Sequence, residues 1–134
     1  MTNVDISIGG NFGINAYKFT LGTGWVSKYT NPGSLPGGYS NITAFAPDNA
    51  TVGVTDSASP YVLLYPWNFG TSFGTKFTNP GSLPGGVGNG VSFTAADVVM
   101  GSSVSPYLHA WLYTGGTGGS FSTKYGDPGT VVTG

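Results

Sequence analysis

Residues 27–38 read SKYTNPGSLPGG, and residues 75–86 read TKFTNPGSLPGG. The two stretches lie 48 residues apart and differ only where Ser27 and Tyr29 are replaced by Thr75 and Phe77. A shorter third copy, TKYGDPG at residues 123–129, follows after another 48 residues. A fixed step of this length indicates that the chain is built from a structural repeat.

Other positions keep the same step. They are three glycines (Gly22, Gly70, Gly118), three aromatic residues (Trp25, Phe73, Phe121) and two asparagines (Asn41, Asn89). The tripeptide Ser-Pro-Tyr occurs at residues 59–61 and 105–107, a step of 46, and a longer glycine-rich loop at residues 115–119 restores the phase. Length changes in loops between kept segments are typical of structural repeats. The chain therefore holds about 2.8 repeats with a period of 48.

The second unit predicts four short strands, at residues 41–45, 50–55, 61–67 and 72–78, before a long link at residues 79–90. These segments are rich in β-branched and aromatic residues, and Gly, Pro, Asn and Asp bound them. Four antiparallel strands in 40 to 50 residues are typical of a β-propeller blade. The first unit predicts only three strands, at residues 4–8, 14–19 and 24–29, so that the innermost one is missing.

We therefore expect an all-β fold, a propeller-like repeat of four-stranded antiparallel blades. Residues 1–134 form a single repeat domain, with a partial blade at 1–30, blades at 39–78 and 87–126, and a tail at 127–134. A β-sandwich, in which the repeats pair face to face, is the alternative. The regular period favours the propeller.

A propeller closes with about four to eight blades, so 2.8 units leave exposed edges and faces. We expect completion by two or three copies of the chain, by docking on another protein, or by further sequence of a longer chain. The candidate assembly edges are apolar residues of the first strand and of the tail: Val4, Ile6, Ile8, Val131 and Val132.

Composition excludes several partners. The 134 residues include four Lys and five Asp, with no Arg or Glu, for a net charge of −1. No basic patch is available for nucleic acid or for anionic lipid, so neither nucleic acid nor a membrane is an expected partner. The absence of Cys removes disulfides and thiolate metal sites. The N-terminal residues predict no signal peptide.

An enzyme would need an acid, a base or a nucleophile in a defined constellation. The Asp residues fall mostly at predicted turns, where Asp binds backbone N–H groups. The single histidine, His109, stands where the second unit has Leu63, which favours a core position. We therefore expect no enzyme activity, no catalytic residues, no cofactor and no metal.

Aromatic pairs close the third strand of each unit, and the two members of a pair share one face. They are Tyr17 with Phe19, Tyr65 with Trp67, and Trp111 with Tyr113. Packing between blades is the simpler interpretation. A sugar-stacking platform is the sharper one, and its candidate residues are Tyr65, Trp67, Trp111 and Tyr113. One lysine also recurs in each unit, at Lys28, Lys76 and Lys124. These lysines are either solvated surface positions or, in an assembled propeller, a ring that binds an anion.

The repeat resembles a known family. The residues that carry the likeness are GTKFTNPGSLP at 74–84, FAPDN at 45–49, SPY at 59–61 and YPW at 65–67. They are similar to the WD40-like β-propeller repeats of many tailed-bacteriophage proteins, over almost the whole chain. The Trp-Asp dipeptide of ordinary WD40 blades is absent here. The resemblance implies a virus-encoded structural or adhesive protein.

These observations together predict a non-enzymatic bacteriophage virion structural protein, a capsid decoration or tail-associated component. We expect it in the virion, after synthesis in the host cytoplasm, as a homo-oligomer or bound to other virion proteins. The alternative function is a glycan-binding, lectin-like module with sites between blades, whose partner is a glycan of the host surface.

Overall fold

The computed structural model describes residues 3–11 and 13–128, and these residues form eleven β-strands and no helix. The first sheet has the order β1-β2-β3 (Asn3–Gly10, Gly13–Thr20, Gly24–Lys28). The second has the order β4-β5-β6-β7 (Ser40–Phe45, Thr51–Asp56, Val62–Asn68, Ser72–Phe73). The third has the order β8-β9-β10-β11 (Gly88–Phe93, Asp97–Ser102, Leu108–Thr114, Ser120–Lys124). The predicted all-β fold is confirmed, and each predicted unit contains one antiparallel sheet.

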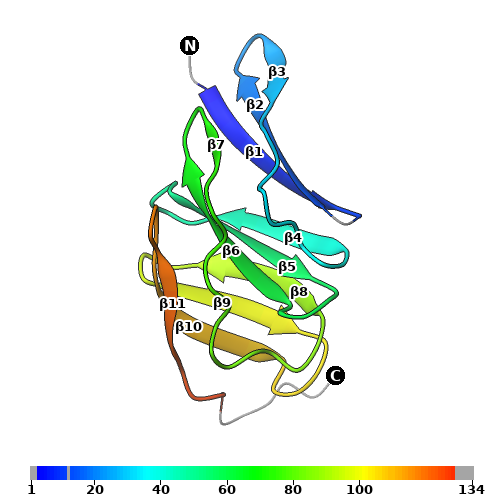
Figure 1. The fold of residues 1–134 in the computed structure, drawn as a ribbon, viewed down its shortest axis with the longest axis vertical. Helices are drawn as coiled ribbons and strands as arrows, with labels where there is room; N and C mark the ends of the chain where they lie inside the picture. Colours follow the sequence, from blue (N-terminus) through cyan, green and yellow to red (C-terminus); the bar gives the residue numbers. More distant parts are fainter. Residues whose placement is uncertain (1–2, 12, 129–134) are drawn as a thin grey trace.

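The three sheets lie one above another along the longest axis of the molecule, with the first at the top and the third at the bottom (Figure 1). Alternate residues of β6 enter two different cores. Leu63 and Tyr65 pack against the first sheet, whereas Val62 and Leu64 pack against the third. The middle sheet is therefore buried on both faces, as the near-continuous apolar sequence of β6 predicts.

Each pair of neighbouring sheets encloses a hydrophobic core. The core between the first and second sheets contains Ile14, Ala16, Tyr29, Val52, Val54, Leu63, Tyr65, Trp67 and Phe73. The core between the second and third sheets contains Ala46, Val62, Leu64, Phe77, Val98, Met100, Trp111 and Tyr113. Burial of a large apolar side chain stabilises a fold by roughly 1.5–3 kcal/mol, so these two interfaces hold the sheets together.

The sequence repeat is also a repeat of local geometry. The three equivalent glycines at turn positions, Gly22, Gly70 and Gly118, all have φ near +80°, a backbone conformation that glycine adopts without strain. The residue that follows each repeated lysine donates its N–H over 2.9 Å to the next-to-last strand of its sheet, which is β2, β6 or β10. These bonds run from Tyr29 to Ala16, from Phe77 to Leu64 and from Tyr125 to Ala110.

One strand is shorter than predicted. The sequence favours a strand over residues 72–78, but β7 ends at Phe73. The following residues still run beside β6, since Gly74 N–H donates to Pro66 O over 2.8 Å and Phe77 N–H donates to Leu64 O over 2.9 Å. Pro66 has no N–H to return a hydrogen bond, so the regular ladder stops there.

Neighbouring sheets approach most closely along their first strands. Asn41 Nδ2 donates to Gly88 O over 2.8 Å and joins β4 to β8. A Cβ atom on Gly88 would lie 2.5 Å from Tyr61 O and 2.6 Å from Thr55 Cβ, so only glycine fits. The other interface has the same close approach, because a Cβ atom on Gly9 would lie 2.4 Å from Ser40 O.

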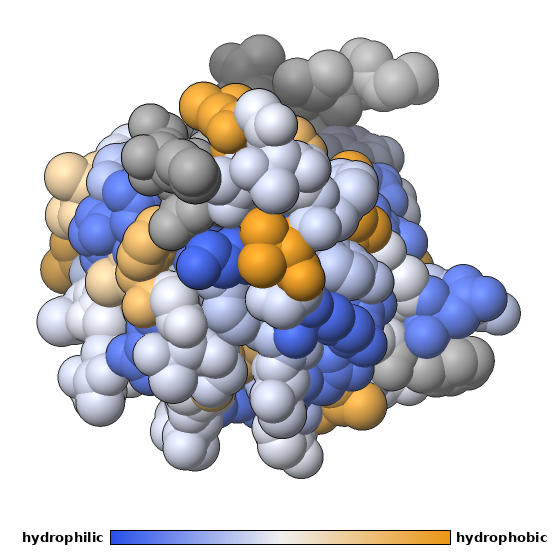
Figure 2. Space-filling view, turned by 90° about the horizontal axis from the view of Figure 1, so that it is seen from above, coloured by the Kyte–Doolittle hydropathy of each residue, from blue (hydrophilic) through white to orange (hydrophobic). Residues whose placement is uncertain are grey.

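Among the sheets formed by residues 3–11 and 13–128, the first and the third each have one face that no other sheet covers. Figure 2 looks down on the end of the molecule that carries the first sheet, where small hydrophobic groups are scattered among pale and hydrophilic residues. We call these two surfaces the outer face of the first sheet and the outer face of the third sheet. They lie at opposite ends of the longest axis (Figure 1).

Candidate functional site

The four aromatic residues predicted for sugar stacking lie inside the molecule. Tyr65 and Trp67 belong to the first core, and Trp111 and Tyr113 belong to the second, each with 5% exposure or less. Tyr65 donates its hydroxyl to Ser34 O over 2.9 Å. Burial raises the pKa of Tyr65, and it raises that of Tyr113 to about 12. In this arrangement of the sheets all four rings pack against protein, and none presents a free face to a sugar.

Asp56 is fully buried at the end of β5, and its side chain accepts hydrogen bonds from backbone N–H groups. Its carboxylate accepts hydrogen bonds from Gly37 N–H at 2.8 Å, Gly38 N–H at 3.2 Å and Ala58 N–H at 3.2 Å. Hydrogen bonds to a carboxylate are stronger than neutral ones and offset its desolvation. Asp56 therefore holds the segment that precedes β4, at Gly37 and Gly38, against the middle sheet.

Two other aspartates also bind local groups. Asp48 accepts the Ala50 N–H over 2.8 Å in a turn, as the sequence predicts. Asp127 pairs with Lys124, three residues before it.

In the part of the chain that the structure describes, no group of three or more His, Cys, Asp or Glu is placed to hold a metal ion. No helix in that part could span a membrane.

His109 is buried in the second interface and stacks on Trp111, with ring centroids 5.8 Å apart and planes at 21°. Neither ring nitrogen of His109 has a hydrogen-bond partner among the described residues, and the same holds for Trp111 Nε1. Burial lowers the pKa of His109, the charge of Lys124 lowers it further, and Asp127 opposes them. The predicted core position is confirmed, and the lowered pKa favours the neutral form of this imidazole.

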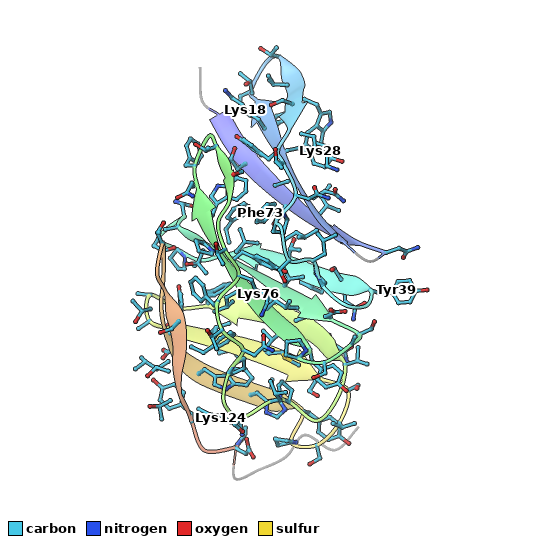
Figure 3. The ribbon with its side chains drawn as sticks, viewed as in Figure 1. Lys18, Lys28, Tyr39, Phe73, Lys76 and Lys124 are labelled. Carbon is cyan, nitrogen blue, oxygen red and sulfur yellow. The ribbon has the colours of Figure 1, made fainter. Side chains whose placement is uncertain are left out.

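Two shallow, open cavities of about 440 and 410 Å³ flank the segment at residues 74–76. Lys76 borders both, but its ammonium group donates to Phe77 O and to Asn79 Oδ1. Burial lowers its pKa. The three repeated lysines are spread along the molecule, with Lys28 near the top, Lys76 in the middle and Lys124 near the bottom (Figure 3). Within one chain they do not converge into a ring for an anion.

An aromatic cluster lies on the outer face of the first sheet. Trp25 is 61% exposed and meets the rings of Tyr17 and Phe19 edge to face, with centroids 5.7 and 5.2 Å apart. Ile8, one of the predicted assembly residues, is also exposed. This cluster contains the first of the three predicted aromatic pairs, Tyr17 with Phe19, and none of the other described sheets covers it.

Of the other four predicted assembly residues, the structure describes only the backbone of two. Val4 and Ile6 occupy β1 positions opposite Phe19 and Tyr17, and their side chains are outside what the structure describes. Val131 and Val132 lie outside the described residues.

The outer face of the third sheet carries apolar residues beside a polar pair. Leu108 and Leu112 are exposed on β10, with the half-buried Ala110 between them. At one side of this stripe Tyr125 donates its hydroxyl to Asp97 Oδ1 over 2.8 Å. This hydrogen bond is the largest cause of a raised pKa of Tyr125.

A matching polar pair lies inside the first interface. Tyr29 donates its hydroxyl to Asp5 Oδ1 over 2.8 Å, and Trp67 Nε1 donates to Asp5 Oδ2 over 3.0 Å across the two sheets. The Tyr29 and Trp67 rings also meet edge to face at 5.0 Å. Burial, followed by Asp5, raises the pKa of Tyr29 to about 12. Sequence analysis missed this cluster. The repeat spacing relates Tyr29 to Tyr125, whereas Asp5 and Asp97 are 92 residues apart and are related only by the pairing of their strands, Asp5 with Lys18 and Asp97 with Leu112.

The described residues thus offer two kinds of site: groups that join one sheet to the next, and two outer faces on which the same kinds of groups are uncovered. Comparison of the chain with protein-family models, with curated proteins and with solved structures finds no match in any of the three.

Proposed function

We propose that the three sheets are blades of a propeller rather than the halves of a β-sandwich. A sandwich has two sheets that share one core, and each sheet keeps one solvated face. Here the middle sheet buries both faces, in two separate cores. The equal spacing of equivalent residues and the close contact of β4 with β8 also support blades that converge along their first strands.

We further propose that the protein is a non-enzymatic structural component of a bacteriophage virion, a capsid decoration or tail-associated protein. The observation that carries this proposal is the pair of uncovered outer faces, which bear exposed residues such as Trp25 and Leu108. Exposed apolar groups at the ends of a stack mark contact surfaces. The ionisable residues support it further, since Asp56, Lys76 and Lys124 are occupied in holding their own loops.

Mass spectrometry of purified phage particles tests this function. A virion component is expected in the particles at a fixed ratio to the major capsid or tail protein, and it should remain after washing in high salt. Absence of the protein from particles, with its presence in the lysate of infected cells, would overturn the proposal.

A glycan-binding role remains the alternative, and the specific observation that favours it is the pair of open cavities beside Lys76. A single weak sugar site binds with a dissociation constant on the order of 1 mM, so a multivalent glycan array is the appropriate assay. Binding that is lost in Lys76→Ala, but kept in Lys28→Ala, would support it. An array without binding would exclude it.

A further inference from the structure

The interface between the first and second sheets has two unlike halves. The first sheet contributes a half that contains the Asp5–Tyr29 pair and the small apolar residues Ile14 and Ala16 of β2. We call this the polar-pair half. The second sheet contributes an aromatic half, in which Phe73 meets the rings of Tyr65 and Trp67 at 5.8 and 4.9 Å.

The outer face of the third sheet repeats the polar-pair half. Matched by the pairing of their strands, the residues equivalent to Asp5, Ile14, Ala16 and Tyr29 are Asp97, Leu108, Ala110 and Tyr125. Asp5 lies opposite Lys18 as Asp97 lies opposite Leu112, and Tyr29 binds Ala16 as Tyr125 binds Ala110. The Tyr–Asp hydrogen bond is 2.8 Å in both places. The backbone hydrogen bond that seats each tyrosine beside its alanine is also equal, at 2.9 Å. In the first sheet this surface is covered by the second sheet, and in the third sheet none of the other described strands covers it.

The outer face of the first sheet repeats the aromatic half. The residues equivalent to Tyr65, Trp67 and Phe73 are Tyr17, Phe19 and Trp25. Their rings meet at 5.7 and 5.2 Å, with planes at 72° and 73°, against 73° for both pairs in the buried half. The two clusters differ in the position of the tryptophan. In the first sheet the tryptophan is Trp25, on β3, after the turn that joins β2 to β3. In the second sheet it is Trp67, on β6, before the turn that joins β6 to β7.

We propose that the outer face of the third sheet of one chain stacks on the outer face of the first sheet of a second copy, so that two chains close a ring of six sheets. This inference rests on the proposed function and names the partner of its contact surfaces. The occupant is a second copy because one chain carries both complementary halves. Contacts of this head-to-tail kind build a ring when the rotation closes, and six sheets fall within the roughly four to eight of propellers.

The pairing assigns one specific contact. In the buried interface Trp67 Nε1 donates to Asp5 Oδ2, which Tyr29 leaves free. On the outer face of the first sheet the indole is Trp25, on β3. Asp97 Oδ2 already accepts the Thr94 hydroxyl over 2.8 Å, so an indole would be a second donor to this carboxylate. We therefore assign a hydrogen bond from Trp25 Nε1 of one chain to the Asp97 carboxylate of the other.

The mass of the chain in solution tests the pairing. Light scattering behind a sizing column should give twice the 13.7 kDa of one chain. Trp25→Arg and Leu112→Arg each place an unpaired charge in the contact and should each give single chains. Phe69→Arg is the matched control, since Phe69 is as exposed as Trp25, at 60%, but lies in the turn between β6 and β7. It should stay paired. Far-ultraviolet circular dichroism confirms that each variant is folded.

A mixing experiment distinguishes head-to-tail contact from a symmetric one. Trp25→Arg retains an intact third sheet, and Leu112→Arg retains an intact first sheet. Mixed in equal amounts, these two single-chain variants should therefore form a species of two chains through one contact. A wild-type single chain would overturn the pairing, and so would a Leu112→Arg variant that stays paired. Species that keep growing with concentration would overturn ring closure.

The assigned hydrogen bond has its own test. Trp25→Phe retains an aromatic ring but removes the N–H together with part of the indole ring, so the comparison with the Asp97→Asn background isolates the hydrogen bond. The two-chain ring contains this contact twice, and each lost hydrogen bond to a charged group weakens binding about 10- to 100-fold. The dissociation constant of the pair should therefore rise about 100- to 10,000-fold. In the Asp97→Asn background the same change should have a much smaller effect, because the two residues share one interaction. Equal effects in both backgrounds would overturn the assignment.

These outcomes separate the inference from the proposed function. A protein that is present in purified particles but a single chain in solution keeps its function and loses the pairing. A two-chain protein that is absent from particles keeps the pairing and loses the function.

Discussion

The same Tyr–Asp pair occurs twice in this protein, in two different surroundings. Tyr29 and Asp5 lie between two sheets and bind Trp67 of the neighbour, whereas Tyr125 and Asp97 lie on an outer face. The hydrogen bond is 2.8 Å in both. The repeat therefore sets the local geometry, and the neighbouring sheet sets the environment. This difference separates a group that stabilises the chain from one that is free to join another chain.

The pKa of each tyrosine reflects the difference. For Tyr29 the largest cause of the raised pKa is burial, whereas for Tyr125 it is the hydrogen bond to Asp97. A charge-assisted hydrogen bond in a low-dielectric interface contributes more than the same bond exposed to water and salt. Substitutions at equivalent positions of the two regions should therefore have unequal effects.

Truncation of the indole in each aromatic cluster, Trp67 in the buried one and Trp25 in the exposed one, should show the largest contrast. Trp67→Ala removes a buried ring from the first core and leaves Asp5 without one donor. We expect a loss of about 3–5 kcal/mol in the free energy of unfolding. Trp25→Ala removes an exposed ring, so its effect should fall on association and leave the unfolding of the single chain within about 1 kcal/mol. Urea unfolding at low protein concentration measures both, and equal losses would contradict the comparison.

The close approach of the second and third sheets gives the next largest effect. In Gly88→Ala the new methyl group would meet Tyr61 O and Thr55 Cβ, so the sheets must separate locally. Overpacking of this kind costs about 1–3 kcal/mol. Gly90→Ala is the matched control in the same strand, because a Cβ atom there meets nothing within 4 Å. Thermal unfolding should show a lower Tm for Gly88→Ala, with Gly90→Ala close to wild type.

Removal of the charge from each polar pair should have a smaller effect. Asp5→Asn weakens the hydrogen bonds from Tyr29 and Trp67 and should cost about 1–2 kcal/mol. Asp97→Asn should leave the unfolding of the single chain close to wild type, since Tyr125 is exposed.

Alkaline titration followed by ultraviolet absorbance gives a second measurement. Asp5→Asn should lower the pKa of Tyr29 from about 12 towards its ordinary value of about 10, while burial keeps it raised. In the wild type the folded-state pKa of Tyr29 is above the unfolded one, so the contribution of Tyr29 to the free energy of unfolding is complete below pH 10. It is lost as the pH rises through about 12. A Tyr29 that titrates as in wild type would show that Asp5 has no part in the shift.

The strands and their grouping were predictable from the sequence, because turn chemistry and the 48-residue step both depend on local residue type. Gly22, Gly70 and Gly118 mark equivalent turns, and all three adopt positive φ. The early end of β7 was not predicted. Its cause is Pro66 on the partner strand, an effect across strands that the sequence of residues 72–78 does not show.

The contacts of Asp5 were also beyond sequence analysis. Its partners, Tyr29 and Trp67, are 24 and 62 residues away, and only the stacking of the sheets brings them together. The aromatic pairs were located correctly, but their sequence does not tell a covered face from an open one. Tyr65 and Tyr17 occupy equivalent positions, and one is buried while the other is half-exposed. The presence of a neighbouring sheet decides this, and it is not a property of either strand.

The smallest effect concerns the second interface, where His109 stands in place of the leucine of the middle sheet. His109→Leu removes two ring nitrogens that have no partner among the described residues and should stabilise the chain by about 1 kcal/mol. The pKa of His109 is lowered in the folded state, so on acidification the unfolded chain binds the proton at a higher pH than the folded chain does. Wild-type stability should therefore be complete above the unfolded pKa of about 6.5 and fall as the pH decreases from there towards the folded-state pKa. Urea unfolding at pH 7.5 and 5.5 should show this loss in wild type and a smaller one in His109→Leu. A loss of the same size in both would show that His109 is not the group that binds the proton.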